Sequence, residues 1–140
     1  PGKSDYWENR LLDHILGAVA STAPATIYVG LVTTLPNDAS TSGALTPGVE
    51  VTGGAYARVA VTNNATNWPA AAAGAKANGT AITFPAPTAN WGVIVGFFLS
   101  DVASGAGNIF YFGAITPNKT VNNGDPAPSF AIGDLDISED

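Results

Sequence analysis

The 140-residue sequence contains no cysteine, no methionine and one histidine, and only 11% of its residues are charged. A typical soluble domain carries roughly 25% charged residues. Without cysteine the chain forms no disulfide bond and no thiolate metal site. Five cations stand against eleven anions. Because phosphates and anionic lipids attract clustered Lys and Arg, the sequence predicts no nucleic-acid partner and no membrane partner.

Groups suited to catalysis are equally scarce. His14 is the one imidazole, and no Asp or Glu lies four residues from it to complete a zinc site. Its neighbour Asp13 points in another direction on a helix. A carboxylate pair such as Glu50 and Asp101 would serve a glycosidase only if the fold placed the two across a cleft. The sequence therefore predicts no catalytic residue, no cofactor and no metal site.

A helix is predicted at the start of the chain, over about residues 5–17, with a helical period that continues to Val19. Asp5 is a suitable N-cap, with Glu8 at the third helical position as in a capping box. An apolar stripe with helical spacing runs along it: Trp7, Leu11 and Ile15, widened by Leu12, Leu16 and Val19. Residues 1–20 are thus interpreted as a helical arm. Its stripe either contacts a neighbouring subunit or covers the sheet of its own chain.

About eight short β-rich runs follow, separated by turn-forming residues. They are residues 26–33, 56–62, 80–84, 91–100, 108–114, 119–121, 130–132 and 135–137. Apolar residues at both parities in 26–33 indicate a strand covered on both faces. Residues 34–54 are predicted to be a long surface loop. The expected fold is one domain over 1–140, mainly β, with the helical arm followed by an antiparallel two-sheet sandwich, jelly-roll-like, over 25–138.

Trp68 differs from the other aromatic residues because it lies in a loop, directly before a proline. It is a candidate contact residue, since Trp often contributes strongly to interfaces, or else it closes the end of the sandwich. We expect the helix 5–17 and the loop 34–54 to carry partner contacts. The predicted interface residues are Trp7, Leu11, Ile15, Tyr56 and Trp68.

Several segments, in this order, resemble a family of small tailed-phage virion proteins. They are DYWENRLLDHIL at 5–16, PATIYVGLVT at 24–33, VTGGAYAR at 51–58, ITFP at 82–85, NWG at 90–92, IFYFGA at 109–114 and KTVNNGD at 119–125. Members of this family open with a similar helix, which a similar strand follows. The resemblance covers nearly the whole chain and implies a non-enzymatic structural part of the virion.

The functional expectation is a capsid decoration, or cement, protein on the capsid exterior, assembled in the host cytoplasm. It would bind the major capsid protein and itself, as a homodimer or homotrimer. Packaged DNA repels an acidic surface, which favours the outside of the particle. The alternative is a tail or tail-fibre component involved in host attachment, and a third interpretation is a glycan hydrolase. Deleting residues 1–17 is expected to abolish particle binding and to leave the sandwich folded.

Overall fold

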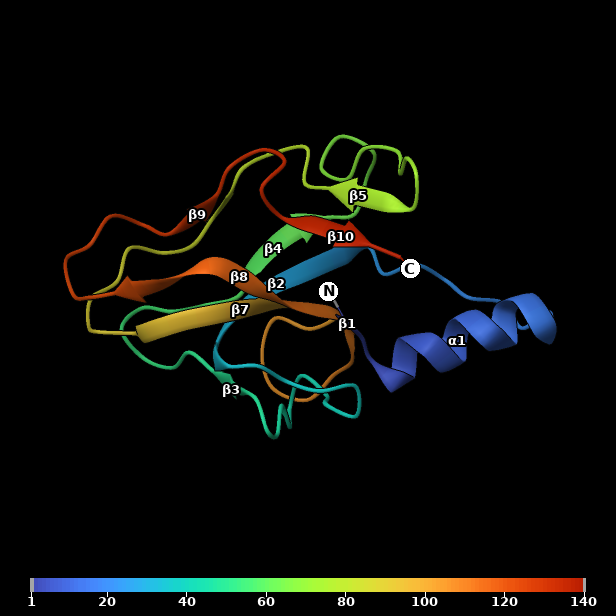
Figure 1. Cartoon of the computed structure of the whole chain (residues 1–140), viewed down its shortest axis with the longest axis horizontal. Coiled ribbons are helices and arrows are strands. Elements are labelled where there is room, and N and C mark those ends of the chain that lie inside the picture. The colour runs from blue at the N-terminus through green and yellow to red at the C-terminus, as the bar shows by residue number, and fades with distance from the viewer. Residues whose placement is uncertain (1, 140) are drawn as a thin grey trace.

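The computed structural model of the chain describes residues 2–139. These residues form one helix and ten strands. The elements are β1 (Gly2–Lys3), α1 (Asp5–Leu16), β2 (Thr26–Thr34), β3 (Val49–Glu50), β4 (Val59–Thr62), β5 (Ala75–Ala77), β6 (Ile82–Thr83), β7 (Gly92–Ser100), β8 (Ile109–Val121), β9 (Ser129–Phe130) and β10 (Asp136–Ser138). The predicted class, mainly β with an N-terminal helix and antiparallel sheets, is confirmed (Figure 1).

The strands form a large sheet and two small ribbons. The large sheet has six strands in the order β1-β8-β7-β2-β3, with β4 also paired to β2. The ribbons are β10-β5 and β6-β9, with two strands each. The larger hydrophobic cluster joins side chains of both parts, among them Val29 and Phe97 from the sheet and Ile82 and Ile137 from the ribbons. The second layer of the sandwich is therefore built from two short ribbons.

The opposite face of the six-stranded sheet is covered by loops. Val32, Phe98 and Ile109, from β2, β7 and β8, form a second cluster with Leu45. Leu45 belongs to the segment 34–54, which is predicted to be a surface loop. Several of its residues are buried, and β3 at its end pairs with β2. This segment lies against the sheet because its apolar side chains complete the second cluster.

Helix α1 begins after Ser4, so the expected N-cap at Asp5 is wrong by one residue. The Ser4 hydroxyl accepts a hydrogen bond from Trp7 N at 3.3 Å and donates one to the carbonyl of Ile109. Serine and aspartate both offer the acceptor that an N-cap needs, but only the hydroxyl also has a proton for a carbonyl. One buried side chain thereby caps the helix and fastens it to β8.

The helix projects away from the sheets and contacts them through its first turn (Figure 1). The rings of Tyr6 and Trp7 pack edge-on against Phe110, with centroids 5.9 and 5.4 Å apart. The helix ends at Leu16, with Gly17 as its C-cap, and none of its residues is buried. The stripe therefore has two parts, one bound to its own sheet and one open to solvent. Within residues 2–139 no helix has the length and apolar character that a membrane crossing requires.

The residues before α1 belong to the sheet. In β1, Gly2 pairs with Phe112 and Lys3 with Tyr111 of β8. Deleting residues 1–17 would therefore remove an edge strand and the Ser4 cap together with the arm. Substitutions on the distal half of α1 separate the arm from the sandwich more cleanly than the deletion does.

Candidate interaction site

The five predicted interface residues lie in three places. Trp7 and Leu11 are half-buried on the first two turns of α1, and Ile15 is exposed on its last turn. Tyr56 is half-buried between β3 and β4, and Trp68 is buried between β4 and β5. Trp7 and Trp68, which lie far apart in the sequence, both line one groove. That these residues contact a partner stays a prediction.

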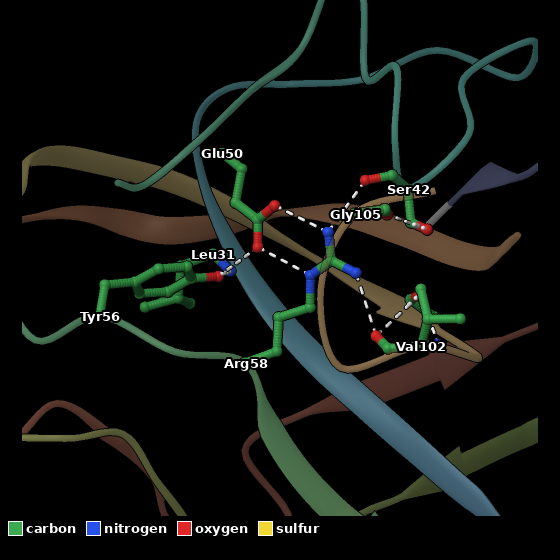
Figure 2. Close-up of polar contacts among 8 residues, drawn as sticks. Leu31, Ser42, Glu50, Tyr56, Arg58, Val102 and Gly105 are labelled. Atoms are coloured by element: carbon green, nitrogen blue, oxygen red, sulfur yellow. Dashed lines mark hydrogen bonds and ion pairs between the residues drawn. The ribbon is translucent and has the colours of Figure 1, made fainter. Parts of the chain in front are cut away.

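A buried polar network surrounds Arg58 (Figure 2). Both oxygens of Glu50 bind its guanidinium, with Oε1 2.8 Å from Nε and Oε2 2.8 Å from Nη2. The carbonyl oxygens of Ser42 and Val102 accept further N–H groups at 2.9 and 3.0 Å. The guanidinium carbon also lies 5.0 Å from the ring centroid of Phe98. One side chain thus holds two loop segments on the sheet, residues 34–54 and the turn that contains Val102.

Tyr56 extends this network (Figure 2). Its hydroxyl donates to Glu50 Oε1 at 2.9 Å and accepts a hydrogen bond from Leu31 N at 2.9 Å. Burial, and then the negative charge of Glu50, raise the pKa of the Tyr56 phenol far above its ordinary value. The phenol is therefore a fixed hydrogen-bond donor inside the fold. Arg58, Glu50 and Tyr56 act as a structural clamp, with their polar atoms used within the chain.

The other carboxylate considered for a glycosidase is engaged as well. Asp101 accepts hydrogen bonds from the backbone N and the Nδ2 of Asn108, at 2.8 and 2.9 Å. Glu50 is bound by Arg58 as described above. Each of these two carboxylates is thus held by its own partner within the fold.

A groove of about 750 Å³ lies beside β7 and β8. Its lining includes Phe97, Phe130, Asp134 and Asp136. The two carboxylates come from one short segment, residues 134–136. Among residues 2–139 there is no group of three or more His, Asp and Glu residues placed to hold a metal ion.

A second polar cluster fastens the root of α1 to both ends of the described chain. Trp7 Nε1 donates to the Tyr111 hydroxyl at 2.8 Å, and this hydroxyl donates to Glu139. Lys3 Nζ lies 2.5 Å from Glu139 Oε2. Burial, and then the hydrogen bond to Glu139, raise the pKa of Tyr111 to about 12. Burial alone would raise the pKa of Glu139, but the hydrogen bonds from Lys3 and Tyr111 outweigh it and lower that pKa.

The pKa shifts of Tyr111 and Glu139 in this cluster predict that the stability of the fold decreases at both alkaline and acidic pH. The pKa of Tyr111 is 10.0 in the unfolded chain and about 12 in the fold, so its contribution is complete below pH 10 and is lost as the pH rises toward 12. The pKa of Glu139 is lowered from 4.5, so its contribution is present above that pH and is lost as the pH falls further. Thermal unfolding across pH, followed by circular dichroism, measures both effects.

Tyr111→Phe should remove only part of the alkaline loss of stability, because the pKa of Tyr56 is raised as well, and it should leave the acidic part largely in place. Glu139→Gln should weaken the acidic part. If the two variants follow the wild-type melting temperature in parallel from pH 3 to pH 12, the cluster does not couple these protons to folding.

An apolar groove of about 350 Å³ lies at the root of the arm. Trp7, Phe110 and Tyr111 form part of its lining at the helix, and Trp68 and Ile137 form part of it toward the ribbon β10-β5. The Trp68 Nε1 atom is buried and has no hydrogen-bond partner among residues 2–139. Buried donors in completed cores are nearly always paired. This groove and the open half of the helix form the candidate interaction site.

Comparison with known proteins identifies the family. No curated protein sequence matches the chain significantly. A family model described as podophage GP4 fiber I protein gp80 matches residues 2–138. The match spans the helix, the sheet and both ribbons, and it confirms the resemblance to small tailed-phage virion proteins. The chain belongs to the family of the podophage GP4 fiber I protein gp80.

Proposed function

We propose that the chain is a non-enzymatic subunit of a phage tail fibre that acts through protein–protein contact. Membership of a family named for a fibre protein supports the fibre. The observation that supports a contact role is the distal half of α1, which carries large apolar side chains in solvent. Exposed apolar patches on soluble proteins commonly mark interaction sites. The engaged carboxylates Glu50 and Asp101 support a role without catalysis.

The main expectation from the sequence, a capsid decoration protein, has less support than its alternative. The family description names a fibre and does not name a head component. A rigid β scaffold with an apolar arm would suit either location. The number of copies and the position in the virion distinguish the two.

Quantitative mass spectrometry of purified virions is expected to find few copies of this protein relative to the major capsid protein. A tail carries few fibres, whereas a decorated shell repeats its cement protein with the capsid lattice. Gold-labelled antibodies should mark the tail in electron micrographs. A ratio approaching one copy per capsid subunit, or a simple fraction of it, with the label over the head, would overturn the fibre proposal in favour of decoration.

A further inference from the structure

The distal half of α1 presents an apolar stripe that the fold leaves uncovered. Leu12 is 57% exposed, Ile15 74% and Leu16 81%, and Val19, which follows the end of the helix, is 54% exposed. The i, i+3, i+4 spacing of Leu12, Ile15 and Leu16 is the pattern with which an amphipathic helix fills a hydrophobic groove. An isolated helix of 12 residues is marginally stable in water. A surface that covers this stripe would therefore also order the arm.

The groove at the helix root offers a surface of matching chemistry. Its lining includes Ile27, Trp68, Leu99, Phe110 and Ile137. A cavity of roughly 150 Å³ holds one benzene-sized molecule, so a groove of about 350 Å³ admits about two aliphatic side chains. The unpaired Nε1 of Trp68 marks this wall as the least completed part of the core.

The exposed stripe on the distal half of α1 does not reach the groove of its own chain. Trp7, at the helix root, is itself one wall of that groove, and Tyr111 holds its indole. Leu12 and Leu16 lie roughly 7 and 14 Å further along the helix axis, and Figure 1 shows the helix running away from the sheets. The stripe and the groove are thus two apolar surfaces that a single chain keeps apart.

We infer that α1 of one copy of this chain docks its stripe in the groove of a second copy. The charged side chains in the groove lining are Lys76 and Glu139. Because Lys3 already pairs with Glu139, Lys76 is the charge that a carboxylate of the second copy would meet. Asp13 is exposed beside Leu16, one turn away, and Lys76 lines the groove. Within its own chain, Lys76 Nζ donates to the carbonyl of Trp68 at 3.3 Å. Docking would bring the Asp13 carboxylate of one copy toward this ammonium of the other.

The inferred contact joins two different surfaces, so its symmetry sets the assembly. Reciprocal docking closes a dimer, whereas docking in one direction leaves a free arm and a free groove and extends into a ring or filament. The inference deepens the proposed function and rests on it, since a fibre is built by repeated contacts between subunits. The test of this inference uses the purified chain alone. If the chain does not associate, the inference fails, and mass spectrometry of virions still decides the location in the virion separately.

Sedimentation of the full chain is expected to show association into species of two or more copies as concentration rises. Ile15→Glu should weaken the association about tenfold or more, because it places a carboxylate in an apolar groove. Ala71→Trp should weaken it similarly, because Ala71 lines the groove and the indole fills it without adding charge. Ile132→Glu is the matched control, since Ile132 is 69% exposed and lies outside the arm and the groove lining.

Unchanged association of the Ile132→Glu variant, together with unchanged circular dichroism of all three variants, would attribute the losses to the contact. A wild-type chain that stays monomeric up to the highest soluble concentration overturns the inference. An oligomer that tolerates both Ile15→Glu and Ala71→Trp overturns it as well.

The lack of cysteine permits an independent measurement by cross-linking. Ile15→Cys protein mixed with Ala71→Cys protein and a short bifunctional thiol reagent should give a cross-linked pair with one chain of each kind. Ile132→Cys mixed with Ala71→Cys should not exceed background. Cross-links that form only between two Ile15→Cys chains would indicate stripe-to-stripe packing and would overturn docking in the groove.

Discussion

Replacing Arg58 with alanine is expected to lower the free energy of unfolding by about 3 kcal/mol. Removing one partner of a buried ion pair costs roughly 3–5 kcal/mol. The lower end applies here because the Glu50 side chain keeps 20% of its surface exposed and water can partly rehydrate it. The alanine would also leave the carbonyls of Ser42 and Val102 without their donor. Urea denaturation measures the loss.

Three further variants separate the causes of this loss. Arg58→Lys keeps the charge but not the planar fork that meets both oxygens of Glu50, so it should recover only part of the stability. Arg58→Met combined with Glu50→Leu removes both charges and should be less destabilised than Arg58→Ala. Lys119→Ala, at an exposed cation of β8, should change stability by less than about 0.5 kcal/mol. If Arg58→Ala matches Lys119→Ala, the clamp contributes nothing to folding.

Replacing Phe98 with alanine is expected to cost about 3–5 kcal/mol, the range for deleting a fully buried ring. Phe98 has 0% exposure and packs in one cluster with Val32, Leu45 and Ile109. This cluster attaches the loop segment of Leu45 to the sheet, so the variant should lose stability and loop order together. Thermal unfolding measures the loss of stability, and amide hydrogen exchange measures the loss of order in the loop. Val93→Ala, at an exposed site on the same strand, should cost less than about 1 kcal/mol.

Gly30 provides the complementary variant. It pairs with Phe98 across the sheet, and a Cβ at Gly30 would lie 2.3 Å from the ring. Gly30→Ala should therefore destabilise the chain by about 1–3 kcal/mol through overpacking. Adding Phe98→Leu should cost less in this background than in the wild type, because the shorter side chain makes room for the methyl group. Strict additivity of the two changes would contradict direct contact.

Helix α1 shows which features of this fold follow from local sequence. Its period and its end near Gly17 follow from residues within one helical turn of one another, and the structure confirms both. The division of the stripe does not follow from them. Trp7 is covered because Phe110 and Tyr111 pack against it, and those residues lie about a hundred positions away. The N-cap also depends on a residue that is distant in the sequence, because the Ser4 hydroxyl donates a hydrogen bond to the carbonyl of Ile109.

Among the strands, too, some follow from local sequence and others do not. Apolar residues at both parities predict β2 as a strand covered on both faces, and it carries consecutive buried residues. β7, from the β-rich run 91–100, carries consecutive buried residues as well. The ribbons depend on only two or three residue pairs each, such as Ile82 with Phe130, and such short strands carry too little local pattern to reveal their partners. The many Gly, Ser and Thr residues in 34–54 predict a surface loop, yet Leu45 within this segment is buried.

The Arg58 clamp was not predicted. A sequence signal existed, because Arg58 is one of five cations and stands in a β-rich run where a charge is unexpected. Its partner was unpredictable, because the path of the intervening loop sets which carboxylate it meets. Trp68 is buried, as expected of a residue that closes the end of the sandwich.

Residues near Ser4 and residues 109–139 build the root of the arm together, which sets an order of events during synthesis. The bond from Ser4 to Ile109 spans 105 positions, so at about 5–20 residues per second the ribosome needs roughly 5–20 s to make the second partner after the first. Until then α1 lacks the strand to which Ser4 binds. Tyr111 and Glu139, which complete the polar cluster at Trp7, are synthesised later still. A chain stopped short of β8 would therefore not orient its arm. Synthesis and folding through residue 139 thus precede assembly, since only a folded subunit that contains these partners presents its apolar stripe in the proposed position.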